Sequence, residues 1–290
     1  MMRSRRDVDG FRVVATVVSA AFAVACLLPF WLVVASSLTS ERELVAHGYT
    51  LWPREFSLAA YHALLTGPRV GLAYLASVFI TVVGTSIALV VTAALAYVIA
   101  GRLRWISKPL TGMTYLPMLF SGGLVPFYIL VTQYLHLTDT YWSVILPNLV
   151  SPFLVFVMVA YFRTLPVDVL DSARIDGASE LTILFRIVLP IAKPILATVG
   201  LFYALHYWNE WFMALLFISD PDRFPLQLLL QNMIANVDSA QAIQVGSTAD
   251  VPIFQLRMAL VLITIGPIIL AYPFVQRYFV RGLTLGATKG

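Results

Sequence analysis

The sequence predicts an all-α membrane protein with six transmembrane helices, and two observations carry this prediction. Hydrophobic residues make up 60% of the 290-residue chain and charged residues only 12%, which is too little charge to coat a soluble domain. Six apolar runs are also long enough to cross about 30 Å of hydrocarbon, which takes roughly 20 helical residues. These runs lie near 11–38, 72–100, 110–135, 141–162, 194–218 and 256–280.

The first run is expected to be an uncleaved span. It follows Arg3, Arg5 and Arg6, as the apolar region of a secretory signal peptide follows positive residues. Its apolar core is longer than that of a signal peptide, however, and no small-x-small cleavage site ends a short apolar region. We therefore treat residues 1–290 as a single transmembrane domain.

The third and fourth runs contain helix-breaking residues, which indicate where these spans lie in the bundle. Proline and glycine inside a span free backbone groups, which must be satisfied by neighbouring helices or within a cavity. We therefore expect these two spans to line the interior of the bundle. The breakers are Pro117, Gly122, Gly123, Pro126, Pro147 and Pro152.

The distribution of Lys and Arg predicts that both termini lie in the cytoplasm. With the N-terminus inside, 14 of the 19 positive residues fall on cytoplasmic segments and 5 on outside segments, as the positive-inside rule requires. The loop 163–193 is then cytoplasmic, and 39–71 and 219–255 are outside loops. The net charge of +4 is interpreted as this sidedness and not as nucleic-acid binding.

The charged loop 163–193 carries the signals of two short helices joined by a turn. It holds four acidic and four basic residues, which hydrocarbon does not accept without a large cost. Pro166 suits the first turn of a helix, Gly177 the left-handed residue that ends it, and Ser179 the cap of the next helix. We expect a helix–turn–helix parallel to the membrane surface, whose second helix has an apolar face of Phe185, Val188 and Leu189.

The same loop carries an ordered motif. Asp171-Ser172-Ala173 is followed after three residues by Gly177 and, after nine more, by Ile187-Val188-Leu189-Pro190. The pattern resembles the Glu-Ala-Ala, Gly, Ile-x-Leu-Pro loop of the permease subunits of ATP-binding-cassette (ABC) importers, with a shorter acid at Asp171 and a polar residue at Ser172. The resemblance implies a coupling helix that docks on an ATPase. It gives this role to Asp171, Ser172, Ala173, Asp176, Gly177, Ala178, Ser179, Glu180, Leu189 and Pro190.

Two further stretches resemble the carbohydrate branch of that family. Residues 206–211, His-Tyr-Trp-Asn-Glu-Trp, are similar to the Trp-Asn-aromatic segment of sugar permeases. Residues 276–290 are similar to the C-terminal signature of the second permease of maltose-type importers. The similarity is nearest to the subgroup that handles complex oligosaccharides, some of them acidic.

The resemblance implies a multi-pass permease subunit in the bacterial cytoplasmic (inner) membrane that imports oligosaccharides by alternating access. The implied partners are a second homologous permease subunit, two ATPase subunits and an extracytoplasmic solute-binding protein, in a lipid bilayer. No cofactor is expected in this chain, because ATP and Mg would be bound by the ATPases. The chain itself lacks a Gly-Lys-Ser/Thr phosphate loop, so we do not expect it to be an enzyme.

The fifth run contains the candidates for a substrate path, which are Tyr203, His206, Tyr207, Asn209 and Glu210. An acid inside a span is a functional candidate, but we favour a structural role in which Asn209 and Glu210 pair with a neighbouring helix. The aromatic residues are candidates for stacking on a sugar ring, although aromatic side chains in spans more often pack or anchor.

Other activities remain as alternatives at this point. A secondary transporter driven by an ion gradient needs an ionisable group within the membrane, and Glu210 is the mid-span acid available for it. A membrane-embedded enzyme needs polar groups that converge at one depth, and the sequence indicates none. Four scattered histidines and one cysteine do not predict a metal site.

Overall fold

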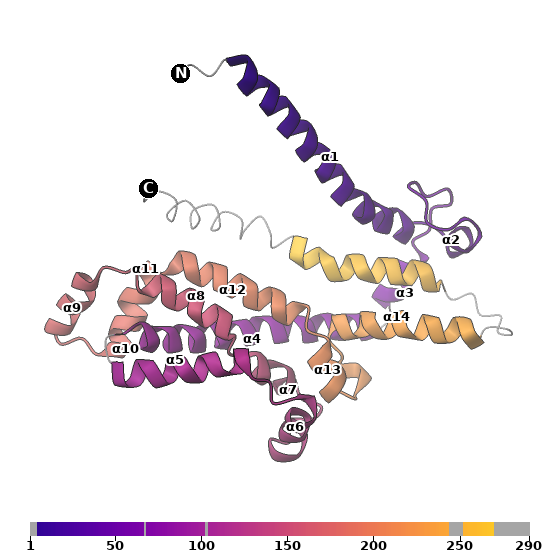
Figure 1. Ribbon diagram of the computed structural model, residues 1–290. Coiled ribbons are helices and arrows are strands. Elements are labelled where there is room, and N and C mark those ends of the chain that lie inside the picture. The colour runs from indigo at the N-terminus through magenta and orange to yellow at the C-terminus, as the bar shows by residue number, and fades with distance from the viewer. Residues whose placement is uncertain (1–4, 67, 102–103, 244–251, 270–290) are drawn as a thin grey trace. The chain divides into compact units, whose positions relative to one another are not determined.

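The computed structural model describes residues 5–66, 68–101, 104–243 and 252–269, and most of these residues are helical (Figure 1). The chain divides into two compact units. The first comprises residues 1–68 and 232–266, and the second comprises 69–231 and 267–290. Among the described residues, extended pairing is limited to one bridge between Thr39 and Phe56. The predicted all-α fold class is confirmed.

The first unit contains a long N-terminal helix and a helix that starts at Ile253. The Glu41 carboxylate accepts hydrogen bonds from the backbone N–H groups of Phe254 (3.0 Å) and Gln255 (2.9 Å). It thus satisfies two of the N–H groups that the first turn of a helix leaves free. The helices of this unit are α1 (Arg5–Ser37), α2 (Glu41–His47), α3 (Ala59–Thr66), the end of α14 (Leu226–Ile243) and most of Ile253–Ile269.

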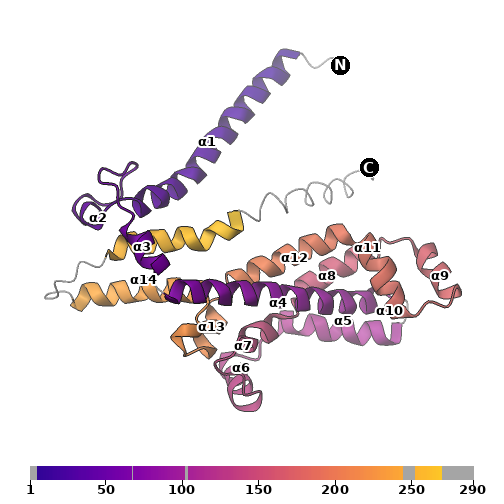
Figure 2. The ribbon, with the colours of Figure 1, turned by 180° about the vertical axis from the view of Figure 1, so that it is seen from behind.

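The second unit is a helical bundle that begins with a 33-residue helix, α4 (Pro68–Ala100). Figures 1 and 2 show α4, α5, α8 and α12 running alongside one another, with α9 at one end of this bundle. The further helices are α5 (Arg104–Leu119), α6 (Leu124–Ile129), η1 (Leu130–Tyr134), α7 (Trp142–Ile145), η2 (Leu146–Asn148), α8 (Pro152–Phe162), α9 (Val167–Ile175), α10 (Glu180–Ile183), η3 (Leu184–Val188), α11 (Leu189–Ile191), α12 (Lys193–Trp208), α13 (Phe212–Phe217), η4 (Pro221–Arg223) and the start of α14.

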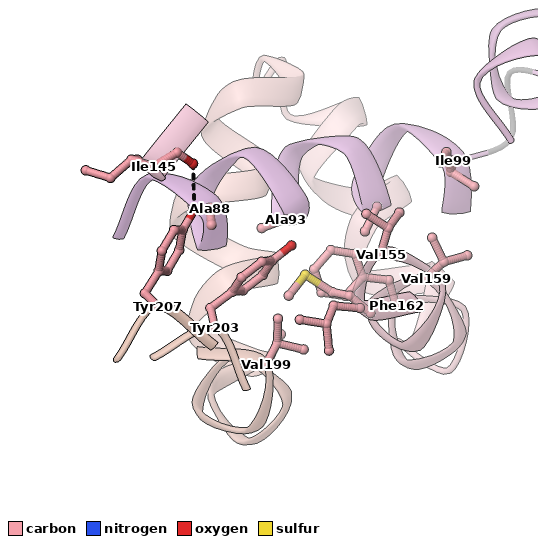
Figure 3. Close-up of a cluster of buried hydrophobic side chains, with 14 of the residues drawn as sticks. Ala88, Ala93, Ile99, Ile145, Val155, Val159, Phe162, Val199, Tyr203 and Tyr207 are labelled. Carbon is pink, nitrogen blue, oxygen red and sulfur yellow. Dashed lines mark hydrogen bonds between the residues drawn. The ribbon is translucent and has the colours of Figure 1, made fainter. Parts of the chain in front are cut away.

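Two tyrosines of α12 organise the core of the second unit (Figure 3). The hydroxyl of Tyr207 donates to the carbonyl of Ile145 at 3.0 Å. The hydroxyl of Tyr203 accepts from the backbone N–H of Ser151 at 3.0 Å and lies 2.7 Å from the Thr92 hydroxyl. Both rings are almost fully buried, so their polar tips are satisfied inside the protein, as buried hydroxyls require. The α12 helix is thereby tied to α4 and to the α7–α8 connection.

The helices agree with the predicted spans in part. Two of them, Arg12–Ser37 and Arg69–Ala100, are long and apolar enough to cross a membrane as single helices. Three bent helix pairs raise the number to as many as five among the described residues. Part of the sixth predicted span, 270–280, lies outside the described residues, so the number of six and the cytoplasmic termini stay predictions.

The predicted third span, 110–135, is not one continuous helix. It starts earlier, at Arg104, and is bent by 116° between Trp105–Leu119 and Leu124–Tyr134. The bend falls at Ser121-Gly122-Gly123, where Gly123 has φ +85°, a conformation that glycine adopts without strain. The helix-breaking residues of this run therefore reverse the direction of the chain, where a kink alone would keep one continuous span.

The segment 219–255, expected as an outside loop, contains the 18-residue helix α14, whose start buries Leu226 and Leu228. The apolar face expected for the second cytoplasmic helix is confirmed for Val188, which is buried, and for Leu189, which packs half-buried against the core. It is wrong for Phe185, which is 51% exposed, while Ile183 and Leu184 are buried. The π-helical turn η3 causes this change, because its wider turn rotates the side chains away from their α-helical positions.

Candidate functional site

The coupling motif forms a short helix with a sharply defined end. The helix α9 begins after Pro166, its N-cap, and its C-cap is Asp176. Gly177 has φ +81°, its N–H donates to the carbonyl of Arg174, and the N–H of Ala178 donates to the carbonyl of Ala173. These two bonds and the left-handed glycine make a Schellman motif. The predicted helix end at Gly177 is therefore confirmed.

The second helix of the loop starts where the sequence predicts. The Ser179 hydroxyl accepts from the backbone N–H of Thr182 at 3.3 Å and lies 2.9 Å from the Thr182 hydroxyl. It therefore caps α10, as expected of a serine at this position. The chain then continues through η3 into α11, where Leu189 and Pro190 stand in the first turn. A bend of 87° separates this segment from α12.

The α9 helix is largely exposed. None of its side chains is buried, and Ile175 near its end is 86% exposed. Only Leu170 and Ala173 pack, half-buried, against the core of the unit. Figure 1 shows α9 at the end of the bundle, beyond α10. Most of the surface of α9 is therefore not covered by the rest of this chain.

Charged groups link the two short helices of the loop. The Arg174 guanidinium donates to Glu180 through Nε (2.8 Å to Oε1) and Nη2 (3.3 Å to Oε2), and to Asp171 through Nη1 (2.9 Å). Arg174 holds the pKa of the Glu180 carboxyl below its usual value, and a hydrogen bond from Tyr97 adds to this effect. The pKa of Arg174 is raised, mainly by the Glu180 hydrogen bonds.

Other predicted coupling residues have local roles or none in the structure. The Ser172 hydroxyl donates to the carbonyl of Asp168 within α9, and Asp176 is exposed. The sequence did not point to Tyr97, whose hydroxyl donates to Glu180 from α4. Its position, 83 residues from Glu180, left no local signal.

The five substrate-path candidates do not form one surface. Tyr203 and Tyr207 are core residues, whereas His206 is half-exposed. Asn209 accepts from the Gln227 amide at 3.1 Å and donates to the carbonyl of Leu205 at 2.7 Å. Asn209 thus acts structurally at the break between α12 and α13, in agreement with the favoured prediction.

Glu210 also has a structural contact. Its Oε1 accepts from the backbone N–H of Met213 at 3.0 Å, and its Oε2 lies 3.7 Å from Nε2 of His206. The Glu210 carboxylate therefore satisfies the start of α13, where the positive end of the helix dipole favours a negative charge.

A cavity of about 360 Å³ lies where η2 meets α8. Its polar lining comes from Asn148, Ser151, Tyr203 and His206, and its apolar lining includes Phe153 and Phe202. Pro152 has no N–H group to donate to the carbonyl of Asn148. The break between η2 and α8 therefore leaves this carbonyl oxygen without a donor from position 152. Sequence reasoning missed Asn148 and Ser151, although the two flanking prolines marked the break.

A second cavity, of about 630 Å³, shares Pro147 and Asn148 with the first and extends to the bend at Ser121–Gly123. Both cavities lie at breakers of the third and fourth runs, and the interior position of these two runs stays a prediction. Among the described residues, no group of three or more His, Cys, Asp or Glu side chains forms a metal site.

Comparison with known proteins gives the family. Residues 88–285, a stretch that contains the coupling motif, match the family described as "Binding-protein-dependent transport system inner membrane component". The chain belongs to this family. The resemblance to ABC importer permeases, stated from the loop motif, is thereby confirmed, and so is an inner-membrane transport component as the class of protein.

Two relatives from Bacillus subtilis (strain 168) cover nearly the whole permease. The polygalacturonan/rhamnogalacturonan transport system permease protein YtcP is 36% identical over 271 residues, 93% of this chain and 94% of its own. Protein LplC is 38% identical over 265 residues, 91% of this chain and 90% of its own.

The fold is similar to a solved structure, that of a bacterial ABC transporter involved in the import of the acidic polysaccharide alginate. The TM-score is 0.83 with 27% sequence identity, and the match covers 96% of this chain and 99% of the other.

Proposed function

We propose that the chain is the permease subunit of an ATP-driven ABC importer that moves oligosaccharides across the cytoplasmic membrane. The observation that carries the coupling part is α9, a short helix fixed by a Schellman motif and without a buried side chain. Its exposed surface, which includes Ile175, docks on an ATPase. Closure of two ATPases around ATP and Mg then moves α9 and rocks the spans between inward- and outward-facing states.

The substrate class is supported by the relatives. One is named for polygalacturonan and rhamnogalacturonan transport, and the solved structure belongs to an importer of the acidic polysaccharide alginate. We therefore propose that the substrate is an oligosaccharide, including acidic polysaccharide fragments, delivered by an extracytoplasmic solute-binding protein. A second homologous permease subunit completes the path.

The cavity beside η2 and α8 supports a contribution of this subunit to the path. It is lined by Asn148, Ser151 and His206 together with apolar residues of α8 and α12. Polar side chains within a membrane bundle face its interior or an aqueous path and not lipid. Hydroxyl and amide groups beside aromatic rings are suited to sugar hydroxyls and ring faces, so we place the sugar-contacting surface of this subunit here.

An ion-gradient transporter is the less supported alternative. Its candidate group, Glu210, is largely shielded and is engaged by the start of α13. This contact accounts for the acid without an ion site.

Copurification with the ATPase subunits tests the proposal. The solubilised permease pair should bring down the ATPases, and Ile175→Asp should weaken this association because it places a charge on the apolar tip of α9. The matched control is Asp171→Glu, which restores the family residue and should leave the association intact. Sugar uptake by the chain in the absence of any bound ATPase would overturn the proposal in favour of the ion-gradient alternative.

A further inference from the structure

The coupling helix α9 has few attachments to its bundle. No side chain of α9 is buried, and a cavity of about 140 Å³, lined in part by Tyr97, Leu170 and Arg174, separates it from the ends of α4 and α8. Only Leu170 and Ala173 supply half-buried apolar contacts. Apolar packing therefore fixes α9 weakly, and its remaining attachments are polar.

These polar attachments form one series of hydrogen bonds that joins α9, α10 and α4. Arg174, on α9, grips both carboxylate oxygens of Glu180, the first residue of α10. The Tyr97 hydroxyl, on α4, donates to Oε2 of the same carboxylate. Asp171 accepts from Nη1 at 2.9 Å, so all three nitrogen atoms of the Arg174 guanidinium are hydrogen-bonded. Bidentate arginine–carboxylate contacts of this kind hold the two side chains in a defined geometry and also contribute binding energy.

We infer that Tyr97 is a positioning residue that ties the coupling helix to α4 through Glu180 and Arg174. The inference rests on the proposed function, because it concerns how motion of α9 reaches the spans. Through the backbone, α9 is joined to α8 and α10 by the short non-helical segments 163–166 and 176–179. The contacts from Arg174 through Glu180 to Tyr97 provide a third connection, which ends on the long apolar helix α4.

The two core tyrosines, Tyr203 and Tyr207, pack against α4, the helix that carries Tyr97. Thr92 of α4 lies 2.7 Å from the hydroxyl of Tyr203, and Gly84 of α4 lies directly against the ring of Tyr207. A displacement delivered at Tyr97 therefore reaches α12, the helix that carries His206 beside the cavity. Without the connection, motion of α9 reaches the spans only through the backbone segments 163–166 and 176–179 and the half-buried contacts of Leu170 and Ala173.

The test uses the assembled complex of both permease subunits, the ATPases and the sugar-loaded binding protein. Tyr97→Phe removes only the hydroxyl, and the matched control is Tyr161→Phe, a half-buried tyrosine near the end of α8. We expect Tyr97→Phe to lower binding-protein-stimulated ATP hydrolysis by about twofold to fivefold, a ratio within the range for exposed charged pairs. The amount of copurified ATPase and the thermal unfolding midpoint should not change.

Two substitutions of Glu180 separate positioning from simple packing. Glu180→Gln keeps an oxygen that accepts from Tyr97 and Arg174, so it should retain most of the stimulation, whereas Glu180→Leu should lose as much as Tyr97→Phe. Adding Tyr97→Phe to Glu180→Leu should cause no further loss, because both remove one contact.

The inference is overturned if Tyr97→Phe keeps wild-type stimulation while Gly177→Leu, which disrupts the end of α9 itself, abolishes it. It is also overturned if the Tyr97→Phe and Glu180→Leu losses simply add. If wild-type complex shows no stimulation at all, the proposed function fails as well, so the two failures are distinguishable.

Discussion

At the scale of single residues, Gly84 has the least room for a side chain among the described glycines. A Cβ atom added at Gly84 would lie 2.8–2.9 Å from three carbon atoms of the Tyr207 ring. The ring has no room to retreat, because it is 2% exposed and its hydroxyl is bonded to Ile145. Glycine is therefore required here by the close approach of α4 and α12, and not by the backbone conformation.

The change Gly84→Ala should destabilise the protein by about 1–3 kcal/mol, the usual cost of overpacking a core. The matched control is Gly200→Ala in α12, where an added Cβ meets Leu89 at an ordinary 3.7 Å. Thermal unfolding of the purified protein in detergent measures both. Equal unfolding midpoints for the two variants would contradict the packing described for Tyr207.

Asp139 provides a second residue-scale prediction, which concerns pH. Its Oδ1 accepts from the backbone N–H groups of Ser219 (2.6 Å) and Asp220 (3.1 Å), and these bonds hold its pKa below the ordinary 3.8. Because the folded-state pKa is the lower one, the stabilisation is complete above the unfolded value and is lost as pH falls through the folded pKa.

At neutral pH, Asp139→Asn should therefore weaken protection of the segment 218–223 against hydrogen exchange only slightly, because the amide oxygen still accepts and asparagine tolerates the φ of +55° at this position. Asp139→Ala should weaken it more. As pH falls through the folded-state pKa, which lies below 3.8, the wild type and the Ala variant should converge. A difference between them that persists unchanged at low pH would show that the carboxylate is not the group that holds this segment.

At the scale of elements, the local signals of the coupling loop were readable from sequence and the long-range ones were not. Gly177 and Ser179 act within a few residues of themselves, so the helix end and the cap followed from residue type. Tyr97 meets Glu180 across 83 positions, and no periodicity encodes such a pair. The π-turn η3 likewise moved Phe185 to the surface, since sequence periodicity assumes a regular helix.

The same distinction explains the helix α14 and the cavity. The segment 219–255 was expected as an outside loop and contains α14, because most helical stability in proteins comes from tertiary packing and Leu226 and Leu228 are buried. Pro147 and Pro152 marked a break from sequence alone. The position of the cavity beside His206 depends on how α8 and α12 pack, which the prolines do not determine.

An element-scale prediction concerns the start of α10. Ser179→Ala removes the cap and should reduce local stability by about 1 kcal/mol. Ser172→Ala is the matched control, because Ser172 bonds within α9 and alanine is the better helix former. Hydrogen exchange of residues 180–183 should rise in the first variant only; a similar rise in both would indicate that Ser179 is not a cap.

At the scale of the whole molecule, the orientation in the membrane decides whether the charged loop 163–193 faces the cytoplasm, where ATP is. Cysteines can be placed one at a time, after replacement of Cys26, at two exposed positions of opposite predicted sidedness. Val45→Cys, 67% exposed, should react with an impermeant thiol reagent added outside intact cells, whereas Ile175→Cys, 86% exposed, should react only after the cells are opened. Labelling of Ile175→Cys from outside would reverse the orientation and remove the ATPase from reach of α9.

The central claim is that α9 couples this permease to ATP hydrolysis, and the most direct measurement is hydrolysis by the reconstituted complex with and without sugar-loaded binding protein. In Gly177→Leu, a bulky side chain replaces the glycine at φ +81°, a left-handed conformation that costs about 1–2 kcal/mol for other residues, at the point where α9 ends. The account predicts normal membrane insertion, with the stimulation by binding protein lost and sugar transport lost with it. Wild-type stimulation in Gly177→Leu would contradict the account.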